Sequence, residues 1–166
     1  MNIFDRKINQ LQYNRYPLST TAIDNTMTQA LFYLMSSDSD LDRLKYACLL
    51  AEKSYRKNKS VFIHSENSQQ SHEIDKLLWS VRDNSFIPHQ IHDSQSPRVA
   101  PITISHQKSA KQQQQVVINL STGLTVNADT QWVLEVVHQR SDIKTLSRAN
   151  WRQYQQQGIT PSIKHC

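Results

Sequence analysis

Short apolar runs alternate with amphipathic helical stretches along most of this chain, and this alternation constrains the fold more than any other feature. Residues 30–35 (ALFYLM) form an apolar run of strand length, and apolar residues then recur every three or four positions from Leu41 to about Lys57. A second apolar run at 61–64 (VFIH) is followed by a helical stretch at about 69–81. Alternation of this kind with short links predicts a parallel sheet covered by helices, with right-handed crossovers.

Three further apolar runs of strand length follow, at residues 101–105, 116–120 and 132–137. Residues 85–89 (SFIPH) contain a proline and are predicted to be irregular, and the polar, Gln-rich residues 106–115 are predicted to form an exposed loop. With a third helix near the C-terminus, the pattern predicts an α/β fold. We expect a Rossmann-like, three-layer arrangement with a mainly parallel sheet of about five strands and flanking helices.

Length and composition bound the domain organisation. The 166 residues suit one domain. Residues 1–29 are polar and lack a sustained apolar period, so we expect a poorly ordered N-terminal extension, with residues 30–166 as a single domain. The two cysteines imply no disulfide framework, and no stretch has the apolar length of a membrane span or of a signal peptide core. We therefore expect a cytoplasmic protein.

The third helical stretch, from Lys144 to Gly158, has two chemically distinct faces. It is rich in Leu, Ala, Arg and Gln, with Ser141 or Asp142 available as N-cap and Gly158 as a stop. One arc of roughly 100° on the helical wheel gathers cations around an indole: Lys144, Arg148, Trp151, Arg152 and Gln155. This face suits a partner with negative charge and an apolar or aromatic group to bury. The alternative is a solvated basic face around a half-buried Trp.

The overall charge of +5 also suggests an anionic partner. The basic residues are spread along the chain and do not form the runs that mark nucleic-acid tails. Direct nucleic-acid binding is therefore the weaker interpretation.

The features that chemistry on a Rossmann-like sheet would need are missing from the sequence. Only two glycines occur, and the turn after the first predicted strand is the acidic SSDSD, which excludes a glycine-rich phosphate loop. His89 and His92 form an H-x-x-H pair, and the other possible metal ligands are Cys48, His64 and His72. A structural zinc site would need a second pair of ligands at a defined spacing, and the sequence has none. No G-x-S-x-G motif is present. We expect no cofactor, no metal and no catalytic residue.

Large apolar residues gather where the second predicted helix ends. Trp79 is followed by a polar link and then by Phe86, Ile87 and Pro88. A group of this size beside an irregular backbone either closes the core or forms a protein-binding surface.

Four motifs in this order resemble the chi subunit family of the bacterial DNA polymerase III holoenzyme. They are FYL in the first predicted strand, LW-x(6)-FIPH at residues 78–89, VVINLS near residue 120, and R-x-x-W-R-x-Y-x-x-x-G from Arg148 to Gly158. Together they span about residues 30–158.

The resemblance implies a non-catalytic accessory subunit with a Rossmann-like fold. It would bridge the clamp loader, through the psi subunit, to single-stranded-DNA-binding protein, and its contact with DNA would be indirect or weak. By match to the family, the acidic C-terminal tail of that protein would bind Lys144, Arg148, Trp151, Arg152 and Gly158. We place the contact of the heterodimer with psi at Trp79, Phe86, Ile87 and Pro88. The alternative function is a degenerate Rossmann-like nucleotide-binding protein or enzyme.

The chain departs from the family pattern at three places. Trp151 stands where some members have Tyr, which keeps an aromatic surface, and the chain ends IKHC without the aromatic residue often found near the family's C-terminus. Residues 1–26 precede Met27, which stands close to where family chains begin. We therefore predict that residues 1–26 are dispensable, and we regard Met27 as an alternative start.

Overall fold

The structure, a computed structural model, describes residues 27–81, 86–92, 99–107, 114–124 and 126–166. Most of the predicted N-terminal extension and the middle of the predicted Gln-rich loop therefore lie outside the described residues. The described elements follow the order β1 (Gln29–Leu34), α2 (Asp40–Tyr55), β2 (Val61–His64), α3 (Ser68–Ser80), β3 (His89–Ile91), β4 (Ile102–Ser105), β5 (Val116–Asn119), β6 (Trp132–Val137), α4 (Ser141–Gln156) and β7 (Pro161–His165).

The described strands form one parallel sheet in the order β3-β4-β2-β5-β6-β1-β7. This confirms the prediction of a Rossmann-like α/β fold, but the sheet has seven strands where about five were expected. The two unexpected strands, β3 and β7, lie at the two edges of the sheet. Since an edge strand is only partly covered, its sequence lacks the apolar run of a central strand, and HQI and PSIKH carry little signal.

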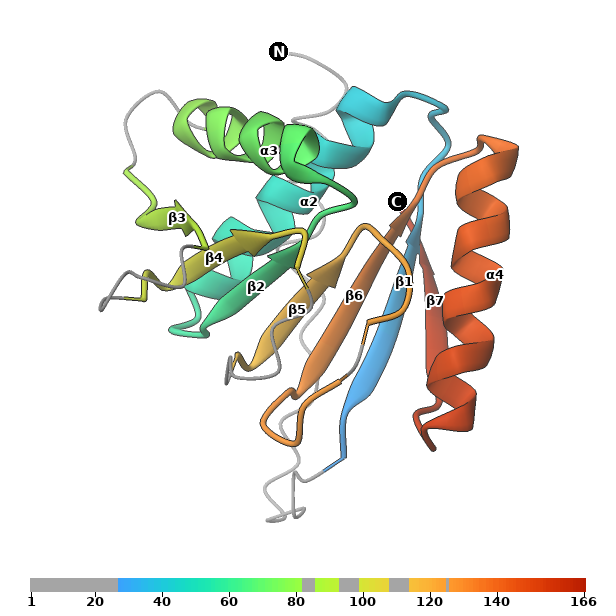
Figure 1. The fold of residues 1–166 in the computed structure, drawn as a ribbon. Helices are drawn as coiled ribbons and strands as arrows, with labels where there is room; N and C mark the ends of the chain where they lie inside the picture. Colours follow the sequence, from blue (N-terminus) through green and yellow to red (C-terminus); the bar gives the residue numbers. More distant parts are fainter. Residues whose placement is uncertain (1–26, 82–85, 93–98, 108–113, 125) are drawn as a thin grey trace.

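The helices cover the two faces of the sheet unequally, with α2 and α3 on one side and α4 on the other (Figure 1). Alternate residues of the central strands point to the two faces, so that Val61 and Ile63 pack towards α2 and α3 while Phe62 packs in the cluster of α4. Burial on both faces explains why these strands are continuous apolar runs in the sequence.

Short polar residues define how the helices begin. Ser39 is the N-cap of α2, with its hydroxyl accepting from the backbone N–H of Asp42 at 3.3 Å, and Asn67 caps α3 in the same way. Helix α4 starts earlier than predicted: Ser141 is its first residue, and Arg140 occupies the N-cap position without a side-chain cap bond. The predicted cap at Ser141 or Asp142 is therefore wrong by one or two residues.

Candidate functional site

Helix α4 can present its cationic side because its opposite side packs on the sheet. Its buried residues recur at spacings of four, three and four, which defines one face of a helix: Ile143, Ser147, Asn150 and Tyr154. The three predicted cations and Trp151 lie outside this stripe. The helix therefore brings Lys144, Arg148, Trp151 and Arg152 together along one flank.

A buried carboxyl group fixes α4 on the sheet. Glu135 of β6 is 0% exposed, and its Oε1 accepts hydrogen bonds from the Tyr154 hydroxyl at 2.5 Å, from Asn119 Nδ2 at 2.7 Å and from Asn150 Nδ2 at 3.2 Å. Burial raises the pKa of Glu135 to about 7, although these hydrogen bonds and the charge of Arg43 act in the opposite direction. Two side chains of the helix are thus tied to one point in the sheet.

The segment after β5 holds the other flank of α4. Asn150 Nδ2 donates to the carbonyl of Ser121 at 2.9 Å, and Gln153 Nε2 donates to the carbonyl of Leu124 at 2.9 Å. On the helix, Gln153 lies on the flank opposite Trp151. These contacts leave the cationic flank available to meet another molecule.

The cations on this flank are not neutralised within the described part of the chain. Lys144 is partly exposed, and Arg148 and Arg152 are exposed. None of the three forms an ion pair with a carboxylate of a described residue, whereas the neighbouring Arg140 pairs with two aspartates. An anionic partner could therefore bind these three cations without displacing a carboxylate of a described residue.

Trp151 is half-buried between these cations and the sheet. Its ring lies on Phe32 of β1, with ring centroids 5.0 Å apart and an angle of 54° between the planes. The buried part fixes the orientation of the indole, and the exposed part remains available for an apolar or aromatic group of a partner.

Strand β7, which was not predicted, extends the same face. Ile163 is the register partner of Phe32, and neighbouring residues in a parallel pair point to the same face of the sheet. Ile163 therefore lies on the α4 side, next to the residue that supports Trp151, and it is 54% exposed. Ile163 was not among the predicted site residues, because its only signal in the sequence is the alternation of apolar and polar residues in PSIKH.

Gly158 has a different role from the other four predicted tail-site residues. Its φ is +77°, and nothing lies within 4 Å of the position that a Cβ would occupy. Its N–H donates to the carbonyl of Gln155, and the N–H of Ile159 donates to that of Tyr154, so the helix closes here. Gly158 thus allows the chain to turn from α4 into β7, and so it helps to position both of these elements on the same face of the sheet.

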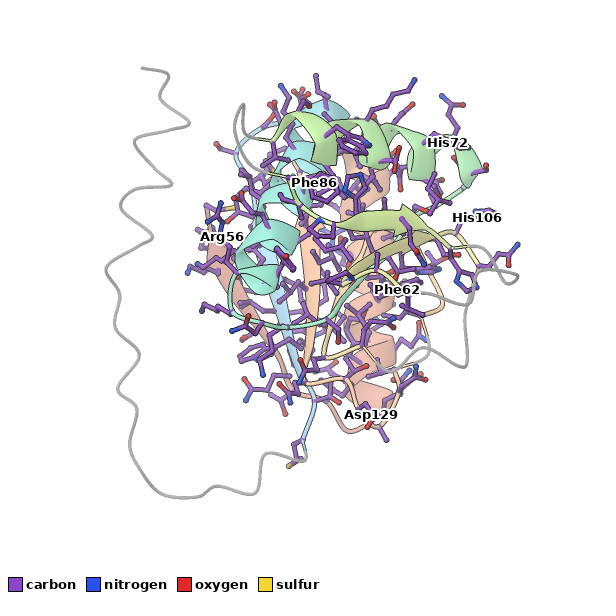
Figure 2. The ribbon with its side chains drawn as sticks, turned by 90° about the vertical axis from the view of Figure 1, so that its left-hand side faces the viewer. Arg56, Phe62, His72, Phe86, His106 and Asp129 are labelled. Atoms are coloured by element: carbon purple, nitrogen blue, oxygen red, sulfur yellow. The ribbon has the colours of Figure 1, made fainter. Side chains whose placement is uncertain are left out.

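A second surface lies at the end of α3, on the opposite face of the sheet (Figure 1). Trp79 is 61% exposed and Phe86 is 68% exposed, and their ring centroids are 5.4 Å apart. Figure 2 labels Phe86 beside α2 and α3. His89 supports the indole, with its ring in an edge contact at 5.2 Å. Two large aromatic rings are thus exposed together.

The four predicted residues of this surface do not all reach solvent. Pro88 is partly exposed, but Ile87 is only 3% exposed and packs in the core cluster under α2 and α3. Only Trp79, Phe86 and Pro88 of the four can therefore contact a partner directly, and Ile87 supports them from within.

The first crossover does not favour phosphate binding. Helix α2, which follows β1, has Asp40 and Asp42 in its first turn, and these carboxylates would repel a phosphate at the helix N-terminus. Within the described residues, no group of three or more His, Cys, Asp or Glu side chains is arranged to hold a metal ion. Among the described helices, none combines the length and the apolar character that a membrane span requires.

Comparison with known proteins finds one family and several curated relatives. Residues 27–162 match the family described as "DNA polymerase III chi subunit, HolC". A protein of Pseudomonas aeruginosa named DNA polymerase III subunit chi is 32% identical over 135 residues, which cover 80% of this chain and 92% of the relative. Proteins of the same name from Escherichia coli and Haemophilus influenzae are 29% and 31% identical, with 80% and 82% of this chain and 95% and 96% of the relatives covered.

Proposed function

Since the chain belongs to the family of DNA polymerase III chi subunits, we propose that it is a non-catalytic accessory subunit of the DNA polymerase III holoenzyme in DNA replication. It pairs with the psi subunit and so joins the clamp loader. Through a second surface it binds the acidic C-terminal tail of single-stranded-DNA-binding protein. The subunit is then a bridge between the polymerase machinery and the coated template strand.

The proposal depends above all on the three cations around the half-buried Trp151, with which no described carboxylate pairs. Arg148 lies between Lys144 and Arg152 along the helix, and a planar guanidinium can bind a carboxylate through two parallel hydrogen bonds. Arg148 therefore anchors the terminal carboxylate of the tail, and the two other cations steer the acidic residues. Trp151 receives the aromatic ring of the tail, with Ile163 at the rim of the same face.

The psi subunit binds the exposed rings of Trp79 and Phe86. Two contacting aromatic side chains of this exposure are typical of the centre of a protein interface, where Trp and other large side chains contribute most of the binding free energy. Helix α3, which carries Trp79, and helix α4 lie on opposite faces of the sheet (Figure 1). Both partners can therefore bind at the same time. A bridge requires this separation.

The test of the tail site is a calorimetric titration of the full chain with the tail peptide in three forms. The peptide is intact, amidated at its C-terminus, or shortened by the C-terminal residue that carries the aromatic ring. We expect both altered peptides to bind more weakly, and we expect affinity to fall with added salt. Arg148→Ala should weaken binding of the intact peptide by about 2 to 5 kcal/mol, and Lys144→Ala should have a smaller effect.

Lys45→Ala is the matched control, because Lys45 is an exposed cation on α2, on the other face of the sheet. It should leave peptide affinity unchanged. Equal binding of the three peptides would refute the assignment of the tail site. Tight, salt-sensitive binding of naked single-stranded DNA through the same residues would replace it with a nucleic-acid site.

The psi surface is tested with a pair of adjacent substitutions. Phe86→Ala should weaken psi binding by about 1 to 3 kcal/mol without changing the thermal unfolding temperature, because the ring is exposed. Ile87→Ala should lower the free energy of unfolding by about 2 to 5 kcal/mol, because it leaves a cavity in the core. If Phe86→Ala unfolds the chain or leaves psi binding intact, the interface lies elsewhere.

A further inference from the structure

In the part of the chain that the structure describes, strand β7 ends the sheet and leaves one edge open. Within the described residues its only neighbour is β1. The N–H of Cys166 donates to the carbonyl of Leu34, and since backbone groups alternate in direction along a strand, the N–H groups of Ile163 and His165 point away from β1. These two amides, and the carbonyls of the same residues, face the open edge. An extended peptide could pair with them as an eighth strand.

Lys164 lies beside this edge on the α2 face. Lys164 is the register partner of Tyr33, and its Nζ lies 6.0 Å from the centroid of the Tyr33 ring. Lys53 lies in the last turn of α2 and Lys57 follows the end of that helix. Burial and then the charges of Lys57 and Lys164 lower the pKa of Lys53. No carboxylate of a described residue pairs with any of them. We call Lys53, Lys57 and Lys164 the lysine cluster.

The two sides of the edge thus differ in character. The α4 side presents Ile163 next to the Phe32 that supports Trp151, and the α2 side presents the lysine cluster. Side chains of an added strand would point alternately to the two sides. The edge therefore suits an extended segment in which apolar and acidic residues alternate.

Three other roles of this edge fit these features less well: an edge protected from pairing, a contact between two copies of the chain, and a nucleic-acid site. Pro161 and Lys164 are residues that protect edge strands from unwanted pairing, but a protected edge would not expose the apolar Ile163. Pairing of β7 with β7 of a second copy would bring the two lysine clusters together, and like charges repel. A nucleic acid could bind the lysines but would leave the outward amides of β7 unpaired.

We propose that the open edge of β7 binds the part of the acidic tail that precedes its last residues as an added strand, with the acidic side chains of that part on the lysine cluster and its apolar side chains against Ile163. This inference rests on the proposed function, because the ligand is the same tail. It extends the binding site from the α4 face, around the edge of the sheet, to the α2 face.

The outward amide of His165 offers a substitution pair that isolates the backbone contact. His165→Pro removes that N–H but no hydrogen bond to β1, and His165→Ala removes the same imidazole but keeps the N–H. In titrations with the intact tail peptide, the Pro variant should bind about 2- to 10-fold more weakly than the Ala variant, as expected for one lost hydrogen bond. Thermal unfolding of both variants verifies that they fold.

A double substitution of Lys53 and Lys57 to Ala tests the lysine cluster. It should weaken binding of the intact peptide about 2- to 10-fold at low salt, and it should leave binding of a peptide of only the last four tail residues unchanged. Amide hydrogen exchange of the unsubstituted chain gives a readout that needs no variant. The amides of Ile163 and His165 should exchange more slowly when the intact peptide is bound.

The outcomes separate this inference from the proposed function. Equal binding by the His165 variants, together with unchanged exchange at Ile163 and His165, would overturn the added strand. If Arg148→Ala still abolishes binding in that case, the tail site on α4 stands. Absence of any binding of the tail peptide by the unsubstituted chain would overturn both. Oligothymidylate that binds through the lysine cluster and is not displaced by the peptide would assign the edge to nucleic acid instead.

Discussion

Replacing Glu135 with glutamine should remove a pH dependence of stability that the buried carboxyl group imposes on the fold. Burial raises its pKa to about 7 from the ordinary value of 4.5, so the folded chain holds the proton more tightly than the unfolded chain does. The resulting stability is fully present below the unfolded pKa and is lost as the pH rises through 7. From pH 5 to pH 8 this loss amounts to about 2 to 3 kcal/mol, at 1.36 kcal/mol per pH unit.

Glu135→Gln also has a cost that does not depend on pH. The carbonyl of the new amide can accept from Tyr154 and Asn119, but its NH₂ group would face Asn150 Nδ2, which is itself a donor. An unpaired buried donor costs about 1 to 3 kcal/mol. The substituted protein should therefore be less stable at pH 5, and the difference from the unsubstituted protein should shrink or reverse at pH 8.

Urea unfolding at a series of pH values measures both effects. The informative quantity is the difference between the two stability curves, because every other titratable group is the same in both proteins. Glu73→Gln is the control, since it makes the same change of charge at an exposed position of α3, and its curve should parallel that of the unsubstituted protein. A Glu135→Gln curve that also ran parallel would refute the perturbed titration.

The remaining predictions concern the support of α4 and the limits of the domain. Tyr154→Phe should lower the free energy of unfolding in urea by about 1 to 3 kcal/mol, because Glu135 and Asn119 lose a hydrogen-bonding partner. Gly158→Ala should lower the thermal unfolding temperature by the equivalent of about 1 kcal/mol, because its φ of +77° strains any residue with a Cβ, although space is free. Deletion of residues 1–26 should leave both the thermal unfolding and the affinity for the tail peptide unchanged, because the described sheet begins at Gln29.

The centre of the fold could be predicted because its signals are local. The central strands are covered on both faces, so each is an apolar run that stands out against the amphipathic helices. The edge strands β3 and β7 are covered on one side only, and their half-exposed residues look like loop. The segment 85–89, predicted to be irregular because of Pro88, overlaps β3 only at His89.

The candidate sites could be predicted only where a single element carries them. The cations and Trp151 share one helix, so helical geometry alone groups them. Ile163 joins the α4 face, and Lys164 the α2 face, only through the pairing of β7 with β1, which no local pattern reveals. Ile87 shows the converse limit, because three successive apolar residues do not indicate which of them faces the core.

The buried Glu135 links stability to the proposed function. Apolar contacts alone would hold α4 on the sheet, but such contacts have little direction and would tolerate small rotations of the helix. Asn150 and Tyr154 form hydrogen bonds to Glu135, and Gln153 forms one to Leu124. All three can form together only at one rotation of α4 about its axis and at one position of α4 along the sheet. That rotation decides where Arg148 and Trp151 point. Variants of this hydrogen-bond network should therefore alter tail affinity as well as stability.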